Sequence, residues 1–191
     1  MKELRTLVVR LFLITAVAGL VLALANGFTA PVIADQQAKK LAESLQDAYP
    51  SAEKIEHMEA SELEGIKPEE HAVHEVFKVM GGSDAVGYIF RTVAKGGFDG
   101  TIEFIVGVSK EGEIQGFKVL NHTETPGFGK QCEEPWFAEG ITGNKTDQEL
   151  TAVESPSTDY DIQAISGSTI TTKAILNGLN DTMEIARALI K

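Results

Sequence analysis

An uncharged apolar run near the N-terminus constrains this chain more than any other feature of its sequence. Residues 11–34 read LFLITAVAGLVLALANGFTAPVIA and contain no charged side chain. A helix rises about 1.5 Å per residue, so about 20 such residues cross a hydrocarbon core roughly 30 Å thick. We therefore expect residues 1–34 to form a short cytoplasmic tip followed by a transmembrane anchor.

The charges on either side of the run indicate its orientation. Three basic residues precede it, namely Lys2, Arg5 and Arg10. Basic flanks tend to stay in the cytoplasm, so we expect a single pass through the inner cell membrane with everything after residue 34 outside. A cleaved signal peptide is the alternative, because Ala23-Leu24-Ala25 has the small residues of a cleavage site. The apolar residues continue to Ile33, which favours a retained anchor.

The charge balance argues against nucleic acid as a partner. The formal net charge is -11, and residues 1–34 carry +2, which leaves -13 for the remainder. Such a surface repels a phosphate backbone. Cys132 is the single cysteine, so neither an internal disulfide nor a cysteine-bound iron–sulfur cluster is expected. No glycine-rich phosphate fingerprint follows a predicted strand, so NAD is not expected to bind here.

The hydrophobic periodicity predicts an α+β fold. Residues 35–48 have helical spacing, with Asp35 as a possible cap, and residues 50–71 are polar and read as helix or loop. Together residues 35–71 form a predicted helical connector. Four segments rich in β-branched and aromatic residues follow, with short turns between them: 72–80, 85–94, 101–109 and 114–120. Short turns favour an antiparallel sheet.

A C-terminal helix completes the predicted domain of residues 72–191. One helical face after residue 169 is apolar, formed by Ile175, Leu179, Met183, Ala186 and Ile190. We therefore expect an antiparallel sheet packed with helices.

The segment Ser166-Gly167-Ser168-Thr169, followed by Ile170-Thr171-Thr172, places a hydroxyl after a glycine turn and at a helix start. Unpaired N–H groups and the helix dipole stabilise a phosphate there. Taken alone, the segment is also what an ordinary helix cap looks like.

Two further motifs precede it. Glu124-Thr125-Pro126-Gly127-Phe128-Gly129 follows a predicted strand, with His122 two positions earlier. Gly87-Tyr88 and the glycine pair Gly96-Gly97 lie upstream. Each alone reads as a strand or a surface turn.

Taken in chain order, the three motifs resemble the FMN-binding domain shared by the G subunits of Rnf-type complexes and the C subunits of Na+-pumping NADH:quinone oxidoreductases. The segment Ser166-Gly167-Ser168-Thr169 resembles the S-G-A-T flavin-attachment motif, in which the threonine carries FMN through a phosphoester bond. The resemblance implies that Thr169 carries covalent FMN and that residues 72–191 are the FMN-binding domain. It also implies flavin-site roles for Ser166, Gly167, Ser168, Thr171, Thr172, His122, Glu124, Thr125, Pro126, Gly127 and Gly129.

The chain departs from the family pattern at two positions. Ser168 stands where the motif has alanine, and Gln163 stands where it usually has aspartate. Asp161 is a possible substitute for that aspartate.

The resemblance implies a membrane-anchored flavoprotein, the G subunit of an Rnf-type ion-translocating ferredoxin:NAD oxidoreductase complex, that relays electrons without catalytic residues of its own. Its expected partners are the other membrane subunits and a flavin-attaching transferase. The alternatives are the C subunit of a Na+-translocating NADH:quinone oxidoreductase and a stand-alone extracytoplasmic FMN-binding or sensory domain.

Other constellations are weaker. His71 and His74 would face opposite sides of a strand, so no metal site is expected. Ser166, His122 and Asp161 lack the nucleophile elbow of a hydrolase. Phe128 and Trp136 are expected to be packing residues, with stacking on the flavin as the alternative.

Overall fold

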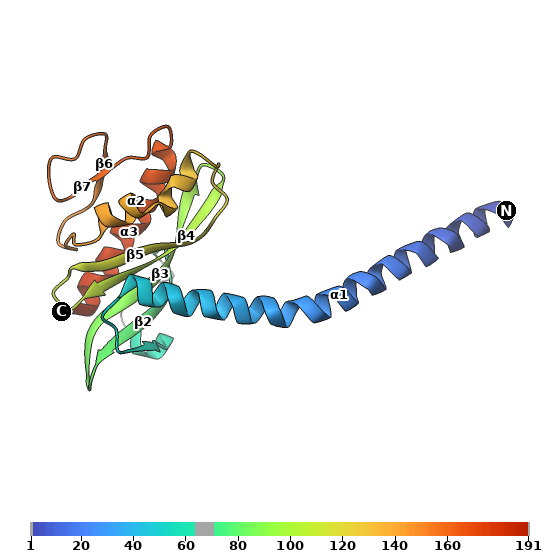
Figure 1. The fold of residues 1–191 in the computed structure, drawn as a ribbon, viewed down its shortest axis with the longest axis horizontal. Coiled ribbons are helices and arrows are strands. Elements are labelled where there is room, and N and C mark those ends of the chain that lie inside the picture. Colours follow the sequence, from blue (N-terminus) through green and yellow to red (C-terminus); the bar gives the residue numbers. More distant parts are fainter. Residues whose placement is uncertain (1, 64–70, 191) are drawn as a thin grey trace. The chain divides into compact units, whose positions relative to one another are not determined.

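The computed structural model describes residues 2–63 and 71–190, which divide into two compact units, Met1–Ala42 and Glu43–Lys191 (Figure 1). The second unit begins earlier than the predicted domain of residues 72–191, because the end of helix α1 and strand β1 belong to it.

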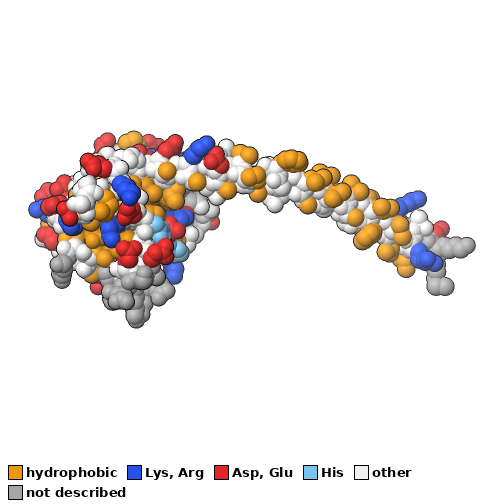
Figure 2. All heavy atoms as spheres, turned by 90° about the horizontal axis from the view of Figure 1, so that it is seen from below, with side chains coloured by type: hydrophobic (Ala, Val, Ile, Leu, Met, Phe, Trp, Pro, Cys, Tyr) orange, Lys and Arg blue, Asp and Glu red, His pale blue; other side chains and the backbone are white. Residues whose placement is uncertain are grey.

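Helix α1 runs without a break from Lys2 to Ala48. The separate helix predicted at residues 35–48 is therefore the continuation of α1, and Asp35 forms an i,i+4 ion pair with Lys39 at 2.8 Å instead of a cap. Within the described residues this is the one helix long and apolar enough to cross a membrane. Figure 2 shows apolar side chains along much of its length and basic ones near its N-terminal end.

The polar side chains within α1 are compatible with a lipid environment. The Thr15 hydroxyl donates to the Leu11 carbonyl at 3.0 Å, and the Thr29 hydroxyl donates to the Ala25 carbonyl at 3.0 Å. Hydroxyls satisfied by their own helix do not need water. Pro31 lies inside the helix and removes one backbone donor, which membrane helices tolerate.

The second unit is built on a five-stranded antiparallel sheet in the order β1-β2-β3-β4-β5. The strands are β1 (Lys54–His57), β2 (Val73–Gly81), β3 (Asp84–Gly97), β4 (Gly100–Ser109) and β5 (Ile114–His122). The last four confirm the predicted antiparallel meander. Strand β1 was missed, because it is short, mostly exposed and lies in a stretch predicted as helix or loop.

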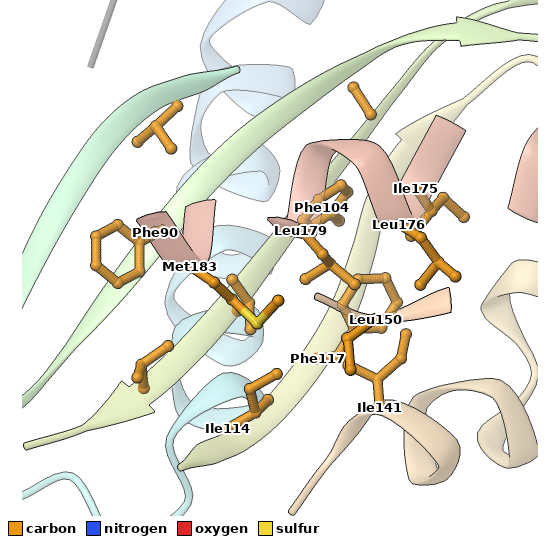
Figure 3. Packing of buried hydrophobic residues seen from close by; sticks show 14 of the residues in the cluster. Phe90, Phe104, Ile114, Phe117, Ile141, Leu150, Ile175, Leu176, Leu179 and Met183 are labelled. Atoms are coloured by element: carbon orange, nitrogen blue, oxygen red, sulfur yellow. The ribbon is translucent and has the colours of Figure 1, made fainter. Parts of the chain in front are cut away.

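Helix α3 (Thr169–Ile190) packs on one face of this sheet, mainly against β3 (Figure 1). Leu179 and Met183 of α3 meet Phe104 and Phe117 in a continuous apolar core (Figure 3). At Gly178 the helix approaches β3 so closely that an added Cβ would lie 2.9 Å from the Ala94 Cβ. The predicted C-terminal helix and its apolar face are confirmed.

Short elements fill the stretch between β5 and α3, where the sequence has few regular signals. They are η3 (Gly129–Glu133), α2 (Pro135–Ile141), β6 (Thr151–Val153) and β7 (Asp161–Gln163), the last two forming a small parallel pair. A 3-10 turn, η1 (Ala60–Leu63), lies before β2. Helix α2 contributes Phe137 and Ile141 to the main core.

The opposite face of the sheet is covered by the end of α1, which rests on three glycines. A Cβ added to Gly107 would lie 2.2 Å from the Ala48 carbonyl oxygen, and one on Gly116 would lie 2.6 Å from that of Asp47. Gly87 on β3 meets the Tyr49 ring, whose hydroxyl donates to the Val86 carbonyl at 3.1 Å. The close approach of backbone to sheet requires glycine at these positions.

We expect Gly107→Ala to destabilise the protein by about 1–3 kcal/mol, because the added methyl overpacks this contact. Gly140→Ala in α2 is the matched control, since a Cβ there meets nothing within 4 Å. It should be neutral or stabilise slightly. Denaturant unfolding of the detergent-solubilised chain measures both, and equal stability of the two variants would contradict the close packing.

Candidate functional site

A cavity of about 550 Å³ opens where three segments of the second unit meet: the β3–β4 turn, the loop after β5 and the start of α3. Its lining residues are Phe98, Glu124, Thr125, Phe128, Gly129, Gly167, Ser168, Thr169 and Ile170.

The walls of this cavity are strongly apolar for an exposed site. Phe98 is 69% exposed, and Phe128 and Ile170 are each 54% exposed. Apart from helix α1, the only other large apolar side chain exposed in the described part of the chain is Trp136. Three of these four side chains therefore line one cavity, which is typical of a ligand site.

The start of α3 is set by a tight turn. Gly167 has φ 72°, in the left-handed region that favours glycine, and a Cβ there would lie 3.1 Å from the Phe128 ring. The Ser168 amide donates to the Ile165 carbonyl at 2.9 Å. The Thr172 hydroxyl accepts from the Ile165 amide at 3.0 Å and donates to the Ser168 carbonyl at 3.1 Å.

Ser168 also receives the first bond of the helix ladder, because its carbonyl accepts from the Thr172 amide at 3.1 Å. The amides of residues 169–171 precede this bond and have no partner further back in the helix. Of these amides, those of Thr169 and Ile170 belong to residues that line the cavity, which is where an anion site requires N–H groups.

The hydroxyls of the motif fall into two groups. Ser168, Thr171 and Thr172 are buried and hydrogen-bonded. Thr169 and Ser166 are exposed, and of these two only Thr169 lines the cavity. Thr169 is thus the one accessible hydroxyl in the first turn of α3.

His122 supports the loop after β5 from behind. Its buried ring accepts a hydrogen bond at Nδ1 from the Glu124 amide at 3.0 Å. The other ring nitrogen, Nε2, lies 3.0 Å from a Glu133 carboxylate oxygen, within ion-pair distance although the angle does not make a hydrogen bond. Because Nδ1 accepts, the ring proton of the neutral form is on Nε2.

The structure brings half of the predicted site residues into the cavity lining. These are Glu124, Thr125, Gly129, Gly167, Ser168 and Thr169. The others do not line it: His122, Pro126, Gly127, Ser166, Thr171 and Thr172.

Sequence reasoning missed the apolar walls. Phe98 closes the glycine motif Lys95-Gly96-Gly97-Phe98 but was given no wall role, and Ile170 was given none either. Phe128, expected to be a packing residue with stacking on the flavin as the alternative, lines the cavity half-exposed, which favours the alternative. A phenylalanine directly after a glycine in a loop, as in Gly97-Phe98 and Gly127-Phe128, was the available signal. Trp136 lies outside the cavity, edge-on to Phe137 at 5.6 Å.

The residues of the weaker constellations make other contacts in the structure. Asp161 accepts hydrogen bonds from the amide and hydroxyl of Ser157, which lower the pKa of its carboxyl group, and from the Thr158 amide. Its carboxylate therefore stabilises the turn of residues 157–161. His71 lies 3.6 Å from Asp181 on α3, whereas His74 is exposed on β2.

Cys132 is buried in η3, directly after the loop that follows β5. Burial raises the pKa of its thiol to about 12, with a further contribution from the negative charges of Glu133 and Glu124. The thiol is therefore protonated at neutral pH, and a protonated, covered thiol is a poor nucleophile.

We expect Cys132 in the folded protein to react with iodoacetamide at pH 7–8 at least ~100-fold more slowly than in denaturant, because the thiolate is the reacting form. A time course of the alkylated mass in both conditions measures the ratio. Equal rates would show that the thiol is accessible and ionised.

Comparison with known proteins shows which kind of domain contains this cavity. Residues 97–184 match the family model described as the FMN-binding domain, and this span contains every residue of the cavity lining. The cavity thus lies within a span that belongs to the class of FMN-binding domains.

Full-length relatives identify the family within that class. The chain is 33% identical to the G subunit of the Na+-translocating ferredoxin:NAD+ oxidoreductase complex of Acetobacterium woodii, over 95% of this chain and 90% of that protein. It is 27% identical to the G subunit of the proton-translocating ferredoxin:NAD+ oxidoreductase complex of Clostridium ljungdahlii, over 88% and 83%. The chain belongs to this family of G subunits of ion-translocating oxidoreductase complexes.

A solved structure supports the fold. The crystal structure of Shewanella oneidensis NqrC is similar with a TM-score of 0.50 and 21% identity, covering 59% of this chain and 56% of that one.

Proposed function

We propose that this chain is the membrane-anchored flavoprotein of an Rnf-type ion-translocating ferredoxin:NAD oxidoreductase complex, with FMN attached to Thr169 through a phosphoester. The observation that carries the proposal is the position of Thr169, which is the accessible hydroxyl of the first turn of α3 and lines an apolar-walled cavity. Family membership supports the electron-transfer role.

The residues present suit FMN. Phe98, Phe128 and Ile170 offer apolar contact to a flat ring, and the volume of about 550 Å³ is in the range of small-molecule sites. The amides of Thr169 and Ile170, which have no partner further back in the helix, suit the phosphate. When bound, FMN supplies one- and two-electron exchange.

The division between exposed and buried hydroxyls supports Thr169 as the attachment residue over Thr171 and Thr172. Both of these are fully buried, and each donates its hydroxyl proton within the protein. Thr169 needs no rearrangement to meet an attaching enzyme.

Attachment requires a transferase and an activated flavin. With a flavin dinucleotide as donor, a bond forms between the Thr169 Oγ1 and the flavin-side phosphorus, while the bond from that phosphorus to the pyrophosphate bridging oxygen breaks and a nucleoside monophosphate leaves. The hydroxyl proton passes to solvent, and no electron is transferred in this step. The product weighs one FMN minus one water more than the chain.

We place the second unit outside the inner membrane, with the N-terminus in the cytoplasm. The basic residues before the apolar run favour this orientation. A tether is useful there, because FMN lost by dissociation outside the cell would not be recovered.

The other redox steps belong to partner proteins of the complex. The single cysteine is buried and protonated, so this chain offers no thiolate set for an iron–sulfur cluster. The names of the relatives favour a ferredoxin:NAD complex over the NADH:quinone alternative. Ferredoxin dependence of the purified complex would separate the two, and purification without any membrane partner would favour a stand-alone domain.

Thr169→Ala should abolish both the added flavin mass and the in-gel fluorescence of protein produced with the attaching enzyme. Ser155→Ala, which removes an exposed hydroxyl outside the cavity, should retain both. Intact mass and fluorescence of the denatured band measure the result. Fluorescence that survives in Thr169→Ala would show that another residue is the acceptor.

Phe128→Ala should weaken reversible FMN binding by about 5- to 150-fold in the Thr169→Ala background, because stacking on an aromatic ring contributes about 1–3 kcal/mol per base. Trp136→Ala is the matched control, since this exposed aromatic lies outside the cavity. Flavin fluorescence titration gives both affinities. A loss in Trp136→Ala as large as that in Phe128→Ala would contradict the assigned wall.

A further inference from the structure

Glu124 is a carboxylate buried among the three segments that form the cavity. Its side chain is 5% exposed, and ionisable groups are seldom buried without partners. Within residues 2–63 and 71–190 no lysine or arginine forms an ion pair with it, and hydrogen bonds take that place.

Its two oxygens are held from two different walls. The Thr171 hydroxyl on α3 donates to Oε2 at 2.5 Å, and the Asp99 amide in the β3–β4 turn donates to Oε1 at 3.3 Å. Glu124 itself lies on the third segment, where its own amide donates to His122 Nδ1. One side chain therefore connects all three parts of the cavity.

Two glycines make room for this carboxylate. A Cβ at Gly129 would lie 2.3 Å from Oε2, and a Cβ at Gly97 would lie 2.6 Å from Oε1. Backbone thus approaches the group from both sides, which fixes its position.

The hydrogen bonds also have a defined direction. Thr171 has one hydroxyl proton, which it donates to Glu124, so in its 2.7 Å contact with the Ser168 hydroxyl it must accept. Ser168 is the residue that stands where the attachment motif has alanine. Its additional hydroxyl is therefore turned inward, and its proton is not available to a phosphate.

We propose that Glu124 is the positioning residue of the flavin site: through Asp99 and Thr171 it holds the β3–β4 turn and the start of α3 in register, and it places an uncompensated negative charge beside the cavity. This inference rests on the proposed function. Two effects follow. The acceptor turn keeps the geometry that attachment needs, and the charge opposes reduction of a flavin in the cavity, which lowers its midpoint potential.

Three variants of the full chain, produced with the attaching enzyme, test the first effect. Glu124→Gln keeps the size but offers one acceptor oxygen to two donors, and Thr171→Val removes the hydroxyl with little change of shape. Each should slow the initial rate of flavin attachment by roughly tenfold or more, the loss expected for a hydrogen bond to a charged group. Thr171→Ser keeps the donor and should remain within about twofold of the unaltered chain.

Two further measurements separate positioning from a general loss of stability. In flavin-free protein, the Asp99 amide should exchange hydrogen at least ~10-fold faster in Glu124→Gln, while the amides of β4 keep their protection. In loaded protein, Glu124→Gln should raise the flavin midpoint potential, and Thr171→Ser should leave it unchanged.

Unaltered attachment rate, Asp99 exchange and potential in folded Glu124→Gln would overturn the proposal. If Glu124→Gln does not fold, the two Thr171 variants decide. Slow flavin attachment in Thr171→Val with a normal rate in Thr171→Ser supports the proposal, and equal attachment rates in the two variants overturn it. Absence of covalent flavin from the unaltered chain would instead refute the proposed function, and Asp99 exchange would still test the bridge through Glu124.

Discussion

The place where helix α3 starts is the constraint on which the site depends. Further along, Gly178 and the buried hydrogen bond between Thr92 and Thr182 fix α3 against β3. At its beginning, the left-handed turn at Gly167 and the double use of the Thr172 hydroxyl hold the last residues before the helix. The same strand β3 continues into the turn that carries Phe98. The helix start and this wall of the cavity are therefore both positioned by β3. The packing of α3 on the sheet therefore places Thr169 at the cavity.

Within that frame, burial sorts chemically similar side chains into different roles. Thr171 and Thr172 follow Thr169 within the same helical turn, yet they are closed inside the protein by hydrogen bonds that use their protons. The Cys132 thiol, which follows the loop, is disabled as a nucleophile by burial, which raises its pKa. Of the motif hydroxyls in the first turn of α3, only that of Thr169 is therefore exposed to the cavity, while the exposed Thr125 lies on the opposite segment, the loop after β5. Among the threonines of the α3 motif, access therefore distinguishes one acceptor from chemically equivalent neighbours.

Strong periodic patterns made much of the fold predictable. The four long strands alternate or carry β-branched residues, and α3 has an apolar face over five turns, so these elements follow from local physics. Strand β1 has four mostly exposed residues and gains its order from pairing with β2, which no local pattern reports. The unbroken α1 was also missed, because the change from apolar to polar composition after residue 34 does not interrupt helical backbone. At the site, the motifs singled out Thr169 and the loop 124–129, from which Glu124, Thr125 and Gly129 line the same cavity as Thr169. The apolar walls and the bridge through Glu124 depend on contacts between residues distant in sequence, such as Glu124 with Thr171, and became visible only in the folded chain.

Direct location of the flavin on protein from native membranes tests the account most sharply. Trypsin should release residues 146–173 as one peptide that contains all the hydroxyls of the motif. Fragmentation of that peptide should place the added mass of one FMN minus water on Thr169. The same mass on Ser166, Ser168, Thr171 or Thr172, or an unmodified peptide from a fully assembled complex, would contradict the account.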